Sequence, residues 1–112
     1  MSLTALFLSI CLHTQLPCDT VDVAYSGMPS DVLGRATMYH GGRTVIRINR
    51  SIQGGPHWLL RNTMLHEVAH LVVWQEYPNK LLSHHGRTFR GVCQKLAQDY
   101  GVSHQSCLEE RV

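Results

Sequence analysis

The sequence has no apolar run long enough to cross a membrane, which excludes one large class of function. A membrane-spanning helix needs about 18 or more consecutive apolar residues, and the most apolar stretch, residues 1–12, is shorter. This stretch also lacks the basic start and the small-residue cleavage site of a secretory signal. We therefore expect a packed amphipathic helix there, and no membrane among the partners of this protein.

Cysteines are few and widely spaced. The four of them, Cys11, Cys18, Cys93 and Cys107, form no C-x-x-C pair, so nothing indicates a zinc ribbon or a disulfide framework. We interpret them as reduced thiols. This interpretation places the protein in the cytoplasm, of a bacterium or, if the protein is viral, of its host.

Repeats and low-complexity tracts are also absent, so residues 1–112 are expected to form a single domain. A chain of this length can bury about two-thirds of its surface without crosslinks. Its apolar content of 44% is ordinary for a globular protein, which excludes a disordered chain. We expect the domain to be a monomer.

Basic residues are missing from the first part of the chain, because residues 1–32 contain no Lys or Arg. Residues 33–95 hold nine basic residues against two acidic ones, Glu67 and Glu76, which gives this segment a charge of +7. Such asymmetry suggests an anionic partner. Weak, sequence-independent DNA binding is one expectation, and scattered solvated arginines are the alternative.

The pattern of apolar residues predicts six elements. Alternation with period two predicts strands at residues 21–25, 33–39 and 44–49, the last two joined as a hairpin through Gly41 and Gly42. Helical spacing predicts helices at residues 2–13, from Pro56 to about Tyr77, and at residues 87–100. The order α-β-β-β-α-α predicts a small α+β domain with helices packed on a three-stranded sheet.

Residues 59–74 carry the clearest chemical signal, the pattern His-Glu-x-x-His at His66, Glu67 and His70. Apolar neighbours on nearly every side predict a buried helix, where such polar groups are costly unless a metal ion or another partner satisfies them. His66 and His70 lie one turn apart on one face. Glu67 lies about 100° away, near enough to reach a metal-bound water. The pattern indicates a zinc hydrolase, although the same string also occurs by chance on exposed helices.

A catalytic zinc needs three protein ligands and an open fourth position, so a third ligand must follow. The metzincin spacing is excluded, because positions 73 and 76 are not the Gly and His that it requires. A glutamate from a later helix would have to be Glu109 or Glu110 in the C-terminal tail. His84 and His85 remain as candidates just before the last predicted helix.

The two motifs together resemble a known family. His66 to His70, followed fifteen residues later by the run His85-Gly86-Arg87-Thr88-Phe89, is similar to the H-E-x-x-H and H-G-x-x-F pair of SprT-like metalloproteases, the group that includes Spartan. The sheet region, with Leu33-Gly34-Arg35 and residues 46–49, is similar as well, so the resemblance covers about residues 30–100.

This resemblance implies a zincin-like fold and a zinc-dependent metallopeptidase acting on a protein or peptide substrate. It implies His66, His70 and His85 as ligands of Zn²⁺ and Glu67 as the general base. The zinc would lower the pKa of a bound water far below that of bulk water, towards about 7, and Glu67 would pass its proton to the leaving amine. For Spartan-like members the resemblance also implies degradation of proteins crosslinked to DNA.

Other features of the mechanism stay open. An extended substrate is expected to pair with an edge strand of the hairpin, residues 44–49 or their neighbour. Tyr39, Tyr77 and Arg87 are candidates for stabilising the oxyanion, and His84 is the alternative third ligand. Two other classes of function also remain: a non-catalytic accessory or virion protein stapled by zinc, and a nucleic-acid-binding module with a vestigial metal site.

Overall fold

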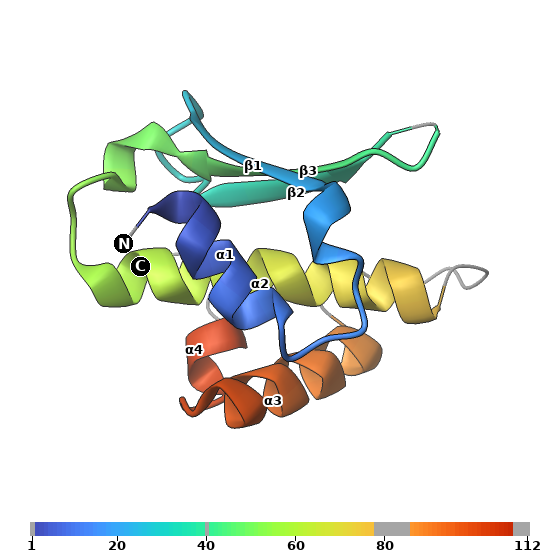
Figure 1. Cartoon of the computed structure of the whole chain (residues 1–112). Coiled ribbons are helices and arrows are strands. Elements are labelled where there is room, and N and C mark those ends of the chain that lie inside the picture. The colour runs from blue at the N-terminus through green and yellow to red at the C-terminus, as the bar shows by residue number, and fades with distance from the viewer. Residues whose placement is uncertain (1, 40, 78–85, 109–112) are drawn as a thin grey trace.

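The computed structural model describes residues 2–39, 41–77 and 86–108 and confirms the predicted α+β class (Figure 1). All six predicted elements are present, with a short fourth helix near the C-terminus that the periodicity did not reveal. In chain order the elements are α1 (Leu3–Cys11), β1 (Val21–Ser26), β2 (Gly34–Met38), β3 (Thr44–Asn49), α2 (His57–Glu76), α3 (Arg87–Tyr100) and α4 (Gln105–Leu108), with 3₁₀ turns at Cys18–Thr20 and Arg50–Ile52.

The three strands form one sheet in the order β1-β3-β2. Strand β3 is parallel to β1 and antiparallel to β2, with which it forms the predicted hairpin. The suggestion that residues 44–49 offer a free edge to a substrate is therefore wrong, since β3 is paired on both sides. Its hairpin neighbour β2, the other candidate, has β3 on one side only in this sheet.

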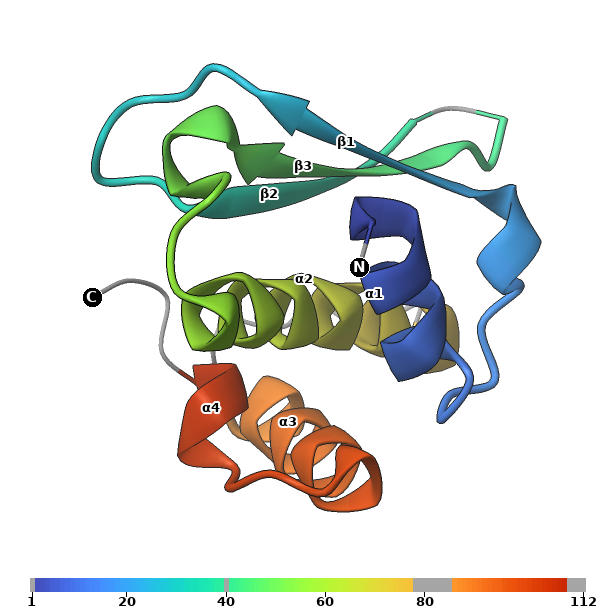
Figure 2. The same ribbon diagram turned by 60° about the vertical axis from the view of Figure 1, so that its left-hand side comes forward.

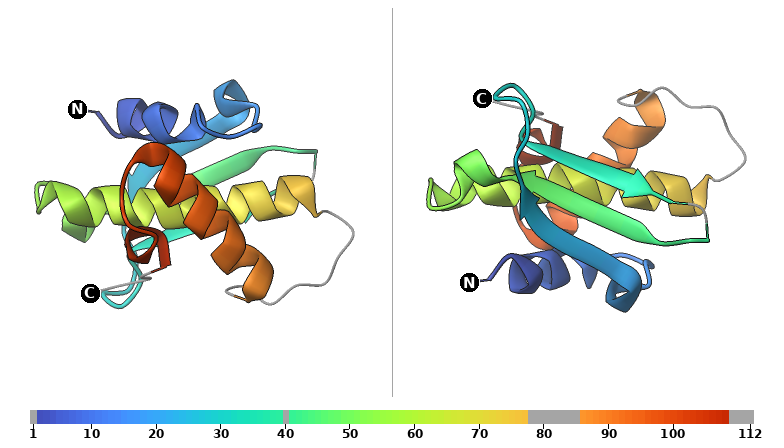
Figure 3. Two further views of the ribbon diagram at one scale, coloured as in Figure 1. Left: turned by 90° about the horizontal axis from the view of Figure 1, so that it is seen from below. Right: turned by 90° about the horizontal axis from the view of Figure 1, so that it is seen from above.

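The layers are the sheet, then α2, then α3 with α4 (Figures 1 and 2). Helix α1 lies beside α2 and packs against it and against β1. Seen from above and below, α2 runs under the sheet and across α3 (Figure 3). Because elements surround α2, every residue of the run 62–73 is buried, as the apolar pattern predicted.

A single asparagine joins the central strand to the loop that precedes β2. Asn49 is 2% exposed, and its amide nitrogen donates to the carbonyl oxygens of Pro29, at 3.1 Å, and Val32, at 2.6 Å. Its backbone N–H donates to the carbonyl of Leu33 at 2.8 Å. A buried side-chain amide bonded in this way fixes its neighbours, so Asn49 sets where β2 begins, at Gly34.

The interpretation of the four cysteines as reduced thiols is wrong, because they form two disulfides. Cys11 at the end of α1 bonds to Cys18, and Cys93 in α3 bonds to Cys107 in α4. The Cα atoms are 6.0 and 5.4 Å apart, within the range that a disulfide needs. The first pair depends on the turn after α1 and the second on the unpredicted helix α4, so neither was visible in the cysteine spacing.

None of the described helices is both long enough and apolar enough to cross a bilayer. The longest, α2, has 20 residues, but its centre carries His66, Glu67 and His70, which face neighbouring elements of the same domain.

Candidate metal centre

His66 and His70 lie together on the side of α2 that faces α3. Their ring centroids are 4.9 Å apart, and the rings are nearly perpendicular. Both residues are buried. The predicted pair is thus brought together, as residues four apart on a helix should be.

Phe89 closes this pair from the side of α3. Its ring centroid lies 4.9 Å from that of His66 and 4.4 Å from that of His70, and the residue is 1% exposed. Phe89 is the Phe of the second family motif. The structure shows that it packs on both imidazoles, so it limits how far either ring can turn.

The ring of His66 is also held by a backbone group. Its Nδ1 lies 2.9 Å from the carbonyl oxygen of Cys107, a buried contact between α2 and α4. A carbonyl oxygen can only accept a hydrogen bond, so Nδ1 carries a proton, and in the neutral imidazole Nε2 keeps its lone pair. This is the arrangement that metal-binding histidines usually have, in which one ring nitrogen donates to a carbonyl and the other binds the ion.

Glu67 faces the opposite layer, the sheet. Its side chain lies against Gly34 at the start of β2: a Cβ placed on Gly34 would be 3.1 Å from Oε2 of Glu67 and 2.9 Å from Cγ2 of Thr63. Glu67 is 6% exposed. The carboxylate therefore sits between α2 and strand β2, on a different side of the helix from the two imidazoles, as the 100° step predicts.

The third ligand cannot be placed from the described residues. His84, His85, Glu109 and Glu110 all lie outside them. Within residues 2–39, 41–77 and 86–108, no group of three or more His, Cys, Asp or Glu side chains could hold a metal ion. The pair His66 and His70 fits two positions of a zinc centre by donor type, and His66 fits also by the hydrogen bond at its Nδ1. A third donor would have to come from elsewhere in the chain.

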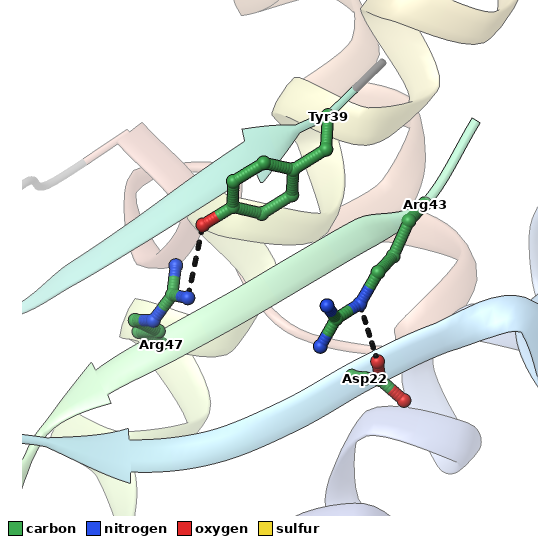
Figure 4. Close-up of polar contacts among 4 residues, drawn as sticks. All are labelled: Asp22, Tyr39, Arg43 and Arg47. Atoms are coloured by element: carbon green, nitrogen blue, oxygen red, sulfur yellow. Dashed lines mark hydrogen bonds and ion pairs between the residues drawn. The ribbon is translucent and has the colours of Figure 1, made fainter. Parts of the chain in front are cut away.

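The candidates for stabilising an oxyanion are dispersed. Tyr77, at the end of α2, and Arg87, at the start of α3, line a groove of about 350 Å³ between α2, α3 and the turn after α1. The described residues that line this groove do not include His66, Glu67 or His70. Tyr39 lies elsewhere, on the outer face of the sheet, where its hydroxyl accepts a hydrogen bond from Arg47 at 3.0 Å (Figure 4).

That outer face carries several of the basic residues of the segment 33–95. The guanidinium groups of Arg43 and Arg47 each lie 5.9 Å from the centroid of the Tyr39 ring, and Arg43 forms an exposed ion pair with Asp22 at 3.2 Å (Figure 4). Arg35 in β2 is the direct partner of Arg47 in β3. Strand alternation thus puts Arg43 and Arg47 on one face, together with Arg35.

Two contributors to the site were missed by sequence reasoning. The Cys107 carbonyl gave no signal, because every residue has one and only the fold decides which one meets an imidazole. Gly34 did give a weak signal, since glycine in a strand often marks a close approach of another group.

The fold described above agrees with a comparison of the sequence with known protein families. The family model described as SprT-like family matches residues 6–108, which is nearly the full chain, and the protein therefore belongs to the SprT-like family. No curated protein matches the sequence significantly.

Proposed function

We propose that this domain is a zinc-dependent metallopeptidase in which His66, His70 and His85 hold the ion and Glu67 is the general base. The observation that carries the proposal is the state of His66, whose Nδ1 is bonded to a carbonyl so that Nε2 keeps its lone pair. His70 lies beside it, and His85 follows from the second motif of the family. Membership of the SprT-like family supports the same assignment.

The chemistry divides between the ion and the chain. Bound zinc would supply a Lewis acid that polarises the peptide carbonyl and lowers the pKa of a water molecule. Glu67, buried beside β2, would take the proton of the attacking water and deliver it to the leaving amine nitrogen. Phe89 and the Cys107 carbonyl would keep the His66 ring in one orientation, which preorganises the site before substrate arrives.

Strand β2 is the proposed place for an extended substrate. It has β3 on one side only within the sheet, and Gly34 at its start brings its backbone against Glu67. A peptide added to this edge would form main-chain hydrogen bonds that do not depend on its side chains. Cleavage would then be broad in sequence preference and would occur next to the proposed base.

The location of the protein is part of the proposal. The cytoplasmic assignment rested on reduced thiols, and the two disulfides remove that support. Disulfides persist in oxidising compartments and are rare in the cytosol of mesophiles, so we propose an oxidising compartment instead. Mass spectrometry of alkylated protein from its own cells tests this, because free thiols at all four cysteines would restore the cytoplasmic assignment.

The test of function combines a metal count with one substitution. We expect elemental analysis to give one zinc per chain in the wild type and in Glu67→Gln. The wild type should cleave an unstructured protein substrate, and Glu67→Gln should lose this activity by several orders of magnitude because only the base is removed. The matched control is Glu76→Gln, an exposed glutamate on the same helix, which should keep both zinc and activity.

Each other outcome selects a different function. Cleavage by Glu67→Gln at the wild-type rate would contradict the mechanism. One zinc per chain without cleavage by any variant would favour the accessory protein stapled by zinc. Absence of zinc from the wild type would leave the nucleic-acid-binding module, whose working surface would be the basic outer face of the sheet.

A further inference from the structure

Cys107 connects three parts of the domain. It lies in α4, its sulfur is bonded to Cys93 of α3, and its carbonyl oxygen is 2.9 Å from Nδ1 of His66 in α2. Both cysteines are fully buried. One residue of a short terminal helix therefore reaches a proposed metal ligand through its backbone and the neighbouring helix through its side chain.

Helix α4 has little ability to hold this position by itself. It spans only Gln105–Leu108, and its backbone hydrogen bonds run to Ser103 and His104 in the turn just before it. An isolated helix of four residues is unstable, because the cost of the first turn is not recovered by further ones. What fixes α4 against α2 is tertiary, namely the buried Cys107 with its disulfide to α3 and the packing of the partly buried Leu108 against the core.

Helix α3 supplies both restraints on His66. Phe89 and Cys93 are four residues apart on α3 and so share the face that meets α2. Phe89 packs against the His66 ring, and Cys93 bonds to the residue whose carbonyl accepts from that ring. Packing by Phe89 holds the His66 ring on one side. The hydrogen bond that also holds it depends on Cys93, through the disulfide to Cys107.

We propose that the Cys93–Cys107 disulfide is a positioning element for metal binding, which holds the Cys107 carbonyl where it fixes the tautomer and orientation of His66. This inference rests on the proposed zinc site. Without the disulfide, the carbonyl leaves Nδ1 as α4 frays, and the proton of the imidazole is shared between its two nitrogens. Loss of such a partner typically lowers metal affinity by about 10- to 100-fold.

The second disulfide provides a matched control within the same chain. Cys11–Cys18 closes a smaller loop, with a separation of 7 residues against 14, and it fixes the turn after α1. The carbonyl oxygen of Cys11 accepts a hydrogen bond from the Thr14 hydroxyl at 2.6 Å, within this turn. Removal of this disulfide should lower thermal stability without changing how the metal is held.

The experiment compares Cys93→Ser/Cys107→Ser with Cys11→Ser/Cys18→Ser and the wild type. Zinc affinity is measured by competition with a chromogenic chelator below the unfolding temperature of every variant. We expect the first double variant to bind zinc at least tenfold more weakly and the second to match the wild type. Equal zinc affinity in all three folded proteins would overturn the proposal while leaving the zinc site intact, whereas no zinc binding by the wild type would refute the proposed function itself.

A measurement on the wild type covers the case in which a variant does not fold. Nitrogen-15 NMR of the zinc-loaded protein reports which imidazole nitrogen of His66 carries the proton. We expect a proton on Nδ1 with slow exchange, consistent with a buried bond to the Cys107 carbonyl. A proton on Nε2, or rapid exchange of the Nδ1 proton, would overturn the proposal.

Discussion

A methyl group on Gly34 would lie 3.1 Å from the carboxylate oxygen Oε2 of Glu67. Separations of this kind are tighter than ordinary contacts, so the start of β2 and the proposed base fit together only because residue 34 has no side chain. The same Cβ would lie 2.9 Å from Cγ2 of Thr63, whose hydroxyl is held by a 2.8 Å bond to the Leu59 carbonyl. The space is closed on both sides, and this makes the position a sensitive test of the site.

Gly34→Ala should displace Glu67 and reduce peptidase activity by at least tenfold while zinc stays bound. Overpacking of this kind costs about 1 to 3 kcal/mol of stability, and a shift of about 1 Å in a catalytic group can cost about 100-fold in rate. Gly27→Ala is the control, because a Cβ there meets nothing within 4 Å. Full activity in Gly34→Ala would show that Glu67 is not placed by this contact.

Phe89→Ala should affect both the fold and the metal. The ring is buried and packs on His66 and His70, so its loss should lower the free energy of unfolding by about 3 to 5 kcal/mol. It should also weaken zinc binding, because the two imidazoles gain room to turn.

Phe7→Ala separates these two effects. Phe7 in α1 is as buried as Phe89, at 1% exposure each, and its removal should cost similar stability. Chelator competition and thermal unfolding of both variants give the comparison. Equal zinc affinity in the folded fractions of Phe89→Ala and Phe7→Ala would limit Phe89 to a role in packing.

The third ligand can be tested directly by substitution. His85→Ala should remove zinc from the purified protein and lower its thermal stability, whereas His84→Ala should keep close to one zinc per chain. The reason is the fifteen-residue spacing from His70 together with Gly86 and Phe89 of the second family motif. Elemental analysis of both variants gives the answer, and the opposite pattern would assign the ligand to His84.

The parts of the fold that the sequence predicted are those with a strong local signal. The burial of α2 followed from its apolar run, and the limits of β3 and α3 followed from periodicity and from Gly101, which ends α3 in a left-handed conformation with φ of 93°. Helix α4 was missed because four residues, Gln105–Leu108, are too few for a period to be read. The disulfide at Cys107 was missed with it.

The candidate site divides in the same way, into residues with a local sequence signal and supports without one. His66, Glu67 and His70 were identified from spacing, and the structure places them as a helix requires. Their supports come from residues distant in sequence: the Cys107 carbonyl is 41 positions from His66, and Gly34 belongs to another layer. Such contacts depend on how helices and sheet pack, which no local pattern in one sequence records.

The last prediction concerns nucleic acid and rests on the outer face of the sheet. Arg35 lies directly opposite Arg47 on neighbouring strands, and like charges in that position repel each other, so a phosphate between them would relieve the repulsion. Arg43 contributes less, because it is already paired with Asp22. Two to three phosphate contacts on this face predict weak, sequence-independent binding of single-stranded DNA, with a salt slope of about −1.4 to −2.1.

Stacking should add little to this affinity, because Tyr39 is the aromatic residue among these charges and its hydroxyl is bonded to Arg47. We expect micromolar or weaker binding at physiological salt, and Arg35→Ala/Arg47→Ala should flatten the slope by about 1.4. Arg90→Ala is the control. Arg90 is exposed on α3, and α3 lies on the opposite side of α2 from the sheet (Figure 1). Titration of labelled single-stranded DNA at two salt concentrations measures both quantities. Nanomolar affinity would mean a larger footprint than this face provides, and no binding at low salt would separate this domain from DNA-bound substrates.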